Sequence, residues 1–519
     1  MTEKDFTFID LFAGIGGFKM ALTNNGGKCI NFSEINNDAI NTYCENHYVP
    51  KEDNLGDITK VKELPSHDIL TAGVPCQSWS IAGKNLGFDD DRGQLWNDTI
   101  YLLKQSQPKA FIFENVKGLV DPRNQEALSY ILDRIKQAGY HAKYYVINSF
   151  DYGVPQNRVR IYIIGFKEKI FFDNFKLPTP FKSKIKLADI LGVQIQEKKE
   201  TETELKDLFG NPIFMKQMSL SSKNGFNDYF LFNDLRNGNT TIHSWDIIKT
   251  TERQKEICLL LLKNRRKSQY GKLDGNPLSL KHFKILDSSI TEKELAELVE
   301  LEILKTEEFR YRINDFDESN LTKEELEILS KQCNAELSVD ELKTYRILKL
   351  KKISIKDSLE TLKEKNIIEC IEVRYDFKNA KISSGLYGIN RVFLPTSDVF
   401  PTLVASDTND YITLTNLKAD NHDNYKEDFL EKVYFSGNYR KITKEEACEI
   451  QGFPKDFILP ESRARWMKLI GNSVSVPVID ALTKAIIDTG VFGKKKKNVT
   501  KQIKHYKTPI KLKNTGVSA

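Results

Sequence analysis

Asp10-Leu-Phe-Ala-Gly-Ile-Gly-Gly17 decides the fold class, because it joins an apolar run to a helix-like stretch through three closely spaced glycines. Glycines at such a junction let the backbone turn sharply and approach a ligand closely. Outward from this turn, short apolar runs alternate with helix-like stretches from Phe6 to about Gly165. This alternation predicts an α/β fold with a doubly wound, mostly parallel sheet covered by helices.

Hydrophobic patterning gives the expected elements of this first domain. The predicted strands are Thr7 to Leu11, Cys29 to Ser33, Ile69 to Ala72, Ala110 to Phe113, Tyr144 to Asn148 and Ile161 to Gly165. The predicted helices lie near Phe18 to Asn24, Asp38 to Asn46, Leu95 to Gln105 and Gln125 to Ala138. An apolar, helix-like run from Val474 to Ile487 is expected to return and cover the same sheet.

The bulk composition is that of a soluble protein with more than one domain: 519 residues, 40% hydrophobic and 29% charged. The net charge is only +5, so a surface for nucleic acid would have to come from local clustering. Seven cysteines form no C-x-x-C pair and no zinc-like grouping with the histidines, which predicts a reducing compartment with neither disulfides nor a metal site. The first residues lack a targeting pattern, and apolar runs such as Cys258 to Leu262 are too short to span a bilayer. We therefore expect a cytoplasmic protein with no membrane partner.

Changes in composition divide the chain into four segments. Residues 1–178 carry the alternation of strands and helices, and residues 179–434 are rich in charged helices without it. Residues 435–490 resume the character of the first segment, so the second segment is predicted to be an insertion. Residues 491–519 form a basic tail that includes Lys494 to Lys497, and this composition predicts disorder and non-specific affinity for nucleic acid.

The inserted segment contains a weak internal similarity at a shift of 64 residues. Each copy is predicted to form an amphipathic helix and then a strand that contains Arg-Tyr, the outline of a helix followed by a wing. Two winged-helix-like units are one hypothesis, and chance similarity in sequence rich in Lys, Glu and Leu is the other. The matching positions are Leu295, Leu298, Glu300, Ile303, Glu308, Arg310 and Tyr311 with Leu359, Leu362, Glu364, Ile367, Glu372, Arg374 and Tyr375.

Two carboxylates follow the glycine turn at spacings that suit a nucleoside. Glu34 comes after the second predicted strand, where a carboxylate can accept hydrogen bonds from two ribose hydroxyls. Asp57, in Gly56-Asp57-Ile58, comes after the next helix and could accept a hydrogen bond from an adenine amino group. A glycine turn alone is about as often a structural bend, but the three features in this order favour an adenosine ligand. The turn is not G-x-x-x-x-G-K-[ST], so a triphosphate is not expected.

Cys76 is the candidate nucleophile. It stands in Gly73-Val-Pro-Cys-Gln-Ser-Trp-Ser80, directly after a predicted strand, on the edge of the sheet where α/β enzymes carry their chemistry. Most single cysteines are inert core residues, but Glu114 ends a further predicted strand and projects from the same edge. A carboxyl group there can hold or protonate a ring nitrogen while a thiolate attacks.

A basic stretch, Gln156-Asn-Arg-Val-Arg160, follows the fifth predicted strand. Alternation along an extended chain would send Gln156, Arg158 and Arg160 to one side. Arginine there can bind a carbonyl oxygen or a phosphate, and a solvated basic strand edge is the alternative.

Together these motifs resemble those of the C5-type DNA cytosine methyltransferases of bacterial restriction-modification systems. In the order of that family the chain carries DLFAGIGGF, Glu34, GDI, GVPCQSWS-x-AG, DDDRGQLW, FENV, QNRVR, RKITKEEACEIQGFP and GNSVSVPV. The resemblance spans roughly residues 5 to 165 and 435 to 490. The middle of the chain, which in the family is the target recognition domain, shows no assignable pattern. The resemblance implies a Rossmann-like, S-adenosylmethionine-dependent methyltransferase fold with a large inserted recognition domain.

The resemblance also implies a mechanism and a set of site residues. Cys76 would add to C6 of a cytosine flipped out of a specific short duplex sequence, Glu114 would contact its N3 and amino group, and Arg160 its O2. Arg158 is grouped with these catalytic residues as a support for the site. Substrate or DNA contacts are implied for Gln77, Ser80 and Gln156, and a brace for the recognition domain at Arg440, Glu446 and Gln451. The implied cofactor positions are Phe12, Gly14, Gly16, Gly17, Glu34, Asp57, Ile58, Pro75, Leu95, Asn472 and Ser473.

The implied partners are double-stranded DNA and a cognate restriction endonuclease that acts on the same site without a stable complex; the enzyme is expected to be a monomer. DNA reading is assigned to the insertion, where Lys263, Asn264, Arg265, Arg266 and Lys267 precede Gln269 and Tyr270. A solvated helix face is the alternative for this cluster. Two other functions stay open: a tRNA cytosine methyltransferase and a catalytically idle DNA-binding regulator. The large insertion favours duplex DNA, and the complete set of motifs disfavours an idle protein.

Overall fold

The computed structural model describes residues 6–75, 91–181, 185–194, 229–231, 242–273, 275–345, 355–378, 389, 391–397, 399–417 and 422–493. Three predicted site residues, Cys76, Gln77 and Ser80, lie outside this part of the chain, as does the basic tail from residue 494.

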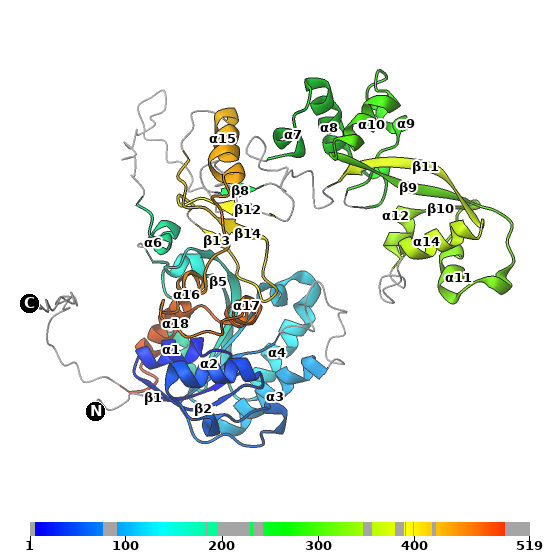
Figure 1. Cartoon of the computed structure of the whole chain (residues 1–519). Helices are drawn as coiled ribbons and strands as arrows, with labels where there is room; N and C mark the ends of the chain where they lie inside the picture. Colours follow the sequence, from blue (N-terminus) through cyan, green and yellow to red (C-terminus); the bar gives the residue numbers. More distant parts are fainter. Residues whose placement is uncertain are drawn as a thin grey trace, which may run out of the picture.

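Six strands form the central sheet, in the order β2-β1-β3-β4-β7-β5 (Figure 1). β1, β2, β3 and β4 pair in parallel, whereas β7 runs antiparallel to both of its neighbours, β4 and β5. The predicted doubly wound, mostly parallel sheet is confirmed, with one strand reversed. The strands are β1 (Phe6–Leu11), β2 (Gly27–Ser33), β3 (Ile69–Gly73), β4 (Ala110–Val116), β5 (His141–Asn148) and β7 (Val159–Phe166).

Helices cover both faces of the sheet because its strands are apolar on both sides. Phe8 of β1 packs in one cluster with residues of α1 and α18, and its neighbour Ile9 packs in a second cluster with residues of α3 and α4. Successive side chains of a strand point to opposite faces of the sheet, so the two clusters lie on the two faces of one sheet. The helices are α1 (Gly17–Asn24), α2 (Asn37–His47), α3 (Asp91–Ser106), α4 (Gln125–Gln137) and α18 (Val476–Asp488).

The C-terminal segment returns to the sheet through α16 (Lys444–Gln451), α17 (Arg463–Asn472) and α18, which corresponds to the predicted run from Val474 to Ile487. In the described chain, Arg463–Asp488 is the one helical stretch long and apolar enough to cross a membrane. Of its most apolar 18 residues, 67% are buried inside the protein. The stretch consists of α17, residues 473–475 and α18. Its burial against the rest of the protein is typical of core helices.

Between β7 and α16 the described residues form two three-stranded sheets, and β13 (Phe400–Pro401) pairs with β6 (Gln156–Asn157) in a third, two-stranded one. One three-stranded sheet, of order β14-β12-β8, lies with α15 above the central sheet in the view of Figure 1, and the other, of order β10-β9-β11, lies in a separate lobe at the upper right. The first comprises β8 (Tyr229–Leu231), β12 (Arg391–Phe393), β14 (Asp410–Ile412) and α15 (His422–Phe429). The lobe comprises α7 (Ser244–Ile247), α8 (Glu252–Asn264), α9 (Leu280–Leu286), α10 (Glu292–Glu300), β9 (Leu304–Ile313), α11 (Lys323–Leu329), β10 (Glu336–Ser338), α12 (Val339–Thr344), α14 (Ile355–Glu364) and β11 (Ile368–Phe377).

The two copies of the internal similarity form the same pair of elements in this lobe: α10 precedes β9, and α14 precedes β11. β9 and β11 pair with each other in antiparallel fashion. Leu337, before α12, pairs with Tyr311 of β9, and Leu278, before α9, pairs with Tyr375 of β11. With residues 278–313 taken as the first copy and residues 336–377 as the second, β9 of the first also pairs with β10 of the second, and β11 of the second also pairs with Leu278 of the first. The winged-helix comparison itself stays a prediction.

Candidate active site

Glu34 ties the glycine turn to the end of β2. The backbone amide of Gly14 donates to its Oε2 at 2.9 Å, and those of Ile35 and Asn36 donate to its Oε1, each at 2.9 Å. Phe12 and Gly14 have φ angles of 52° and 55°, in the left-handed region. One carboxylate thus fixes a tightly turned loop at the carboxyl edge of the sheet, which is where open α/β sheets bind ligands.

The surroundings of this turn fit an adenosine-containing ligand. No heavy atom lies within 4 Å of the position that a Cβ on Gly14 would occupy, so the turn borders open space. Glu34 and Asp57 are both half-buried, and Asp57 also accepts a hydrogen bond from the backbone amide of Thr59 at 3.1 Å. Ile58 beside it is buried. Two carboxylate acceptors beside an open turn suit the hydroxyl and amino donors of a nucleoside.

The other predicted cofactor positions differ in exposure. Phe12, Pro75 and Leu95 are half-buried, Asn472 is exposed and Ser473 is buried. Gly16 and Gly17 are buried and allow close packing: a Cβ on Gly17 would lie 2.7 Å from Cγ2 of Val474, and one on Gly16 would lie 2.1 Å from Nε2 of His47. These two glycines therefore set how closely the neighbouring elements approach the turn.

Glu114 and Arg160 form a buried ion pair across two neighbouring strands. Glu114 is in β4 and Arg160 in β7, and the Arg160 Nε lies 3.2 Å from the Glu114 Oε1. Their side chains are only 11% and 14% exposed. Burial raises the pKa of Glu114, and the positive charges of Arg160 and Arg158 act in the opposite direction. The carboxyl group can therefore hold a proton closer to neutral pH than an ordinary glutamate.

The strand before Cys76 ends beside this ion pair. Gly73, three residues before Cys76, pairs with Glu114, and the Glu114 Oε2 lies 4.0 Å from the position of a Cβ on Gly73. Asn115 is buried and donates from Nδ2 to the carbonyl oxygen of Val74 at 3.1 Å. Sequence reasoning missed Asn115 as a site residue, although its place beside Glu114 in FENV was a signal. It fixes the backbone two residues before the candidate nucleophile.

Arg158 is buried and points into the protein. It donates to the carbonyl oxygens of Leu403 at 3.1 Å, Gly471 at 3.2 Å and Ser473 at 2.6 Å. Burial lowers the pKa of Arg158 to about 9, and the charge of Arg160 acts in the same direction. Arg158 thus holds the end of α17 and the returning chain against the sheet.

Gln156, predicted to contact substrate or DNA, has no exposed surface. Its Nε2 donates to the carbonyl oxygen of Ile450 at 3.1 Å and to Oε1 of Gln451 at 2.9 Å, and Gln451 in turn donates to the carbonyl oxygen of Ser473 at 2.9 Å. In this conformation Gln156 cannot touch DNA. It joins α16 to the sheet.

Arg440 and Glu446, predicted to brace the recognition domain, form a two-point ion pair with distances of 2.8 and 2.7 Å. Glu446 also accepts from the backbone amide of Thr443, so it caps α16. The backbone of Arg440 exchanges two hydrogen bonds with Ile412 of β14. The pair therefore connects the returning segment to the insertion.

The basic cluster at the end of α8 was predicted to attract DNA phosphates, and a DNA contact is wrong for three of its residues because they are buried. Arg265 is buried, lies 2.9 Å from Asp376 and stacks over the ring of Phe377. Asn264 and Tyr270 are also buried. The exposed members are Lys263, Arg266, Lys267 and Gln269. Arg265 turns inward because Asp376, 111 residues away in the chain, neutralises it.

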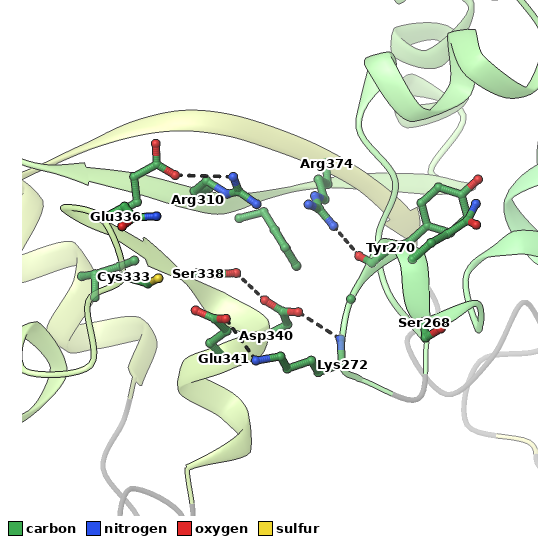
Figure 2. Close-up of a pocket in the computed structure, with 15 residues that line it drawn as sticks. Ser268, Tyr270, Lys272, Arg310, Cys333, Glu336, Ser338, Asp340, Glu341 and Arg374 are labelled. Atoms are coloured by element: carbon green, nitrogen blue, oxygen red, sulfur yellow. Dashed lines mark hydrogen bonds and ion pairs between the residues drawn. The ribbon is translucent and has the colours of Figure 1, made fainter.

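A polar hollow of about 410 Å³ lies between the two copies of the lobe (Figure 2). Lys272 donates from Nζ to Glu341 at 3.1 Å and from its backbone amide to Asp340 at 3.0 Å. Arg310 pairs with Glu336, and Arg374 donates to the carbonyl oxygen of Tyr270. The charged side chains labelled in Figure 2 thus all have protein partners, so the hollow is a polar joint between the copies.

Comparison with known proteins agrees with this geometry. The family model described as "C-5 cytosine-specific DNA methylase" matches residues 6–488. The type II methyltransferase M.HgiBI of Herpetosiphon aurantiacus is 41% identical over 486 residues, covering 93% of this chain and 97% of that protein. M.NlaIV of Neisseria lactamica is 30% identical over 507 residues, and the match covers 94% of this chain and 100% of that protein. M.HpaII of Haemophilus parainfluenzae is 45% identical over 191 residues, covering 36% of this chain and 53% of that protein.

Several lines of observation meet in this site. The glycine turn with Glu34 and Asp57 suits an adenosine cofactor, and the buried Glu114 and Arg160 pair lies where the strand before Cys76 ends. M.HgiBI and M.NlaIV, which match over most of the chain, are type II methyltransferases. The chain therefore belongs to the C-5 cytosine-specific DNA methylase family and is a DNA cytosine methyltransferase that uses S-adenosyl-L-methionine.

Proposed function

We propose that the enzyme methylates C5 of one cytosine in a specific short duplex sequence, through a covalent bond from Cys76 to C6 of the base. The observation that carries this proposal is the buried pair of Glu114 and Arg160 beside the strand that leads to Cys76. A cytosine ring seated there would meet an acid or hydrogen-bond donor and a cation on its polar edge. In a restriction-modification system the product would protect host DNA.

The ring needs activation because cytosine C5 is a poor nucleophile. The thiolate of Cys76 forms a bond to C6, and the electron pair of the C5–C6 double bond becomes available at C5. Glu114 at N3 and Arg160 at O2 stabilise the charge that develops on the ring. Burial of Glu114 helps, because its raised pKa favours a carboxyl that carries a proton for N3.

Methyl transfer and release complete the cycle. S-adenosylmethionine, when bound, would supply an activated methyl group: C5 forms a bond to the methyl carbon as the sulfonium–methyl bond breaks, which leaves S-adenosylhomocysteine. Loss of the C5 proton to water or another base restores the double bond, and Cys76 leaves C6 as a thiolate. Gln156 and Arg158 keep the returning segment in place during these steps.

The cofactor is proposed to lie along the carboxyl edge of β1, β2 and β3. Glu34 would accept from the ribose hydroxyls, and Asp57 with Ile58 would receive the adenine. Phe12 and Gly14 would line the turn, with Gly16 and Gly17 behind it. The remaining proposed contacts are Pro75, Leu95, Asn472 and Ser473.

Reaching C6 inside stacked DNA requires base flipping, so the cytosine is proposed to rotate out of the helix into the site. Residues 1–178 and 435–490 would form the catalytic domain, and residues 179–434 would recognise the target. The tail, residues 491–519, and Gln77 and Ser80 would add DNA contacts. The enzyme is proposed to act in the cytoplasm as a monomer, without a stable complex with a cognate endonuclease.

The test is a methyl-transfer assay with methyl-labelled S-adenosylmethionine on mixed-sequence duplex DNA and on tRNA. The wild type should label duplex DNA, whereas Cys76→Ala should bind DNA and transfer nothing. Cys333→Ala, at an exposed thiol in the lobe, is the matched control and should keep full activity. Labelling of tRNA alone would favour the tRNA enzyme, and normal activity of Cys76→Ala would remove the mechanism.

A further inference from the structure

A histidine that the mechanism does not use lies against the back of the glycine turn. His47, the last residue of α2, places Nε2 3.1 Å from the carbonyl oxygen of Ile15. A carbonyl oxygen only accepts, so this hydrogen bond requires the tautomer with a proton on Nε2. Burial lowers the pKa of His47 to about 4, so the ring is neutral near pH 7.

The ring is held in one orientation. It lies edge-on to Tyr43, with ring centroids 4.8 Å apart and planes at 62°, and to Phe457, at 6.2 Å and 64°. A Cβ on Gly16 would lie 2.1 Å from its Nε2. Gly16 is therefore required for this approach as well as for its left-handed φ of 86°. Ile15 is fully buried, so its carbonyl oxygen depends on a protein donor.

The same helix fastens the turn to the C-terminal segment. The Asn46 side chain donates to the carbonyl oxygen of Ile458 and accepts from its backbone amide, each at 2.8 Å. Asp38, at the start of α2, accepts from Nε of Arg465 at 2.8 Å. Arg465 lies in α17, which ends at Asn472, a proposed cofactor contact. α2 thus joins the two chain segments that are proposed to meet at the cofactor.

We infer that His47 is a positioning residue for cofactor binding: its Nε2–H holds the Ile15 carbonyl and so fixes the glycine turn in the shape that receives S-adenosylmethionine. This inference rests on the proposed cofactor site. It assigns His47 no contact with the cofactor or with DNA. The effect is therefore expected in cofactor affinity, with the chemical step unchanged once the cofactor is bound.

Two variants of the full chain separate the hydrogen bond from ring packing. His47→Phe keeps an aromatic ring between Tyr43 and Phe457 but loses the donor, whereas His47→Gln carries an amide donor with a similar reach. Titration calorimetry with S-adenosylhomocysteine measures cofactor affinity, and steady-state assays give KM for S-adenosylmethionine and kcat. Duplex binding and thermal unfolding report on DNA affinity and on the fold. Glu34→Ala tests the cofactor site itself.

For His47→Phe we expect a dissociation constant and KM raised about tenfold, because a buried carbonyl loses its donor. The kcat at saturating cofactor and the DNA affinity should stay within twofold, and His47→Gln should recover most of the loss. Wild-type cofactor affinity in His47→Phe would overturn the inference, as would equal losses in both variants or an equal loss of DNA binding. If His47→Phe and Glu34→Ala both kept wild-type cofactor affinity, the proposed cofactor site itself would be wrong. If Glu34→Ala lost cofactor affinity and His47→Phe kept it, only the role of His47 would fail.

Discussion

Replacement of Glu114 by glutamine tests the proposed chemistry with little change of shape. Glutamine keeps an oxygen that can accept from the Arg160 Nε, now 3.2 Å from Oε1, but it cannot carry a carboxyl proton. The side chain is almost enclosed between β4 and β7, so the substituted amide stays in place. The variant therefore removes the acid and leaves the site.

The expected loss follows from the role of the carboxyl group. A positioned general acid contributes about 10²- to 10⁴-fold, which is roughly 3–5 kcal/mol of activation free energy. The pH dependence has a definite sign. Burial raises the pKa of Glu114, so the protonated form persists to higher pH than in an ordinary glutamate and is lost as pH rises through that raised pKa. Wild-type turnover should therefore fall as the pH rises through the raised pKa of Glu114. The residual turnover of Glu114→Gln should not show this fall.

Single-turnover methyl transfer to duplex DNA across a range of pH measures both effects. Glu126→Gln, at an exposed position of α4, is the matched control and should behave as the wild type. DNA and cofactor affinities of Glu114→Gln should stay within a few-fold of the wild type. A rate within threefold of the wild type, or a rate loss explained entirely by weaker DNA binding, would refute the reasoning.

Three further predictions concern buried charges. Burial raises the pKa of Asp10 to about 8, so the folded protein keeps a proton that the unfolded chain loses above about pH 4. Wild-type stability should therefore fall by up to about 1.4 kcal/mol per pH unit between roughly pH 4 and 8, and Asp10→Asn should lack that slope in urea unfolding. Arg158→Met should lower the free energy of unfolding by roughly 2–4 kcal/mol, because three carbonyl oxygens lose a charged donor; an inactive variant of wild-type stability would instead make Arg158 a substrate contact. Arg265→Ala should cost about 3 kcal/mol or more by leaving Asp376 buried and unpaired, and Lys263→Ala should cost nothing measurable in the same denaturation assay.

The sheet was predictable because its signals are local. All six predicted strands and all four predicted helices of the first domain are present, since apolar runs and helical periodicity are set by neighbouring residues. β4 continues three residues beyond the predicted end at Phe113 because Val116 still pairs with Arg160 of β7. That antiparallel pairing is a long-range contact, and no sequence pattern in either strand predicts it.

Motif residues were predicted more completely than their surroundings. Glu114 and Arg160 do lie together, but the side-chain directions of Gln156 and Arg158 depend on carbonyl oxygens about 300 residues away in the chain. Arg265 was misassigned for the same reason, because its partner Asp376 is in β11, 111 residues away in the chain. The internal similarity predicted matching helices and strands, whereas the exchange of strand partners between copies required the structure.

The most direct test of the central claim is the intact mass of the enzyme after reaction with duplex DNA in which every cytosine is 5-fluorocytosine. Fluorine replaces the C5 proton that a base must remove and cannot leave as a cation, so the reaction should stop after methyl transfer with the base still bound to the enzyme. With S-adenosylmethionine present, the account predicts a stable adduct that peptide mapping assigns to Cys76 and that is absent from Cys76→Ala. An adduct at another residue, or none from an enzyme that methylates normal DNA, would contradict it.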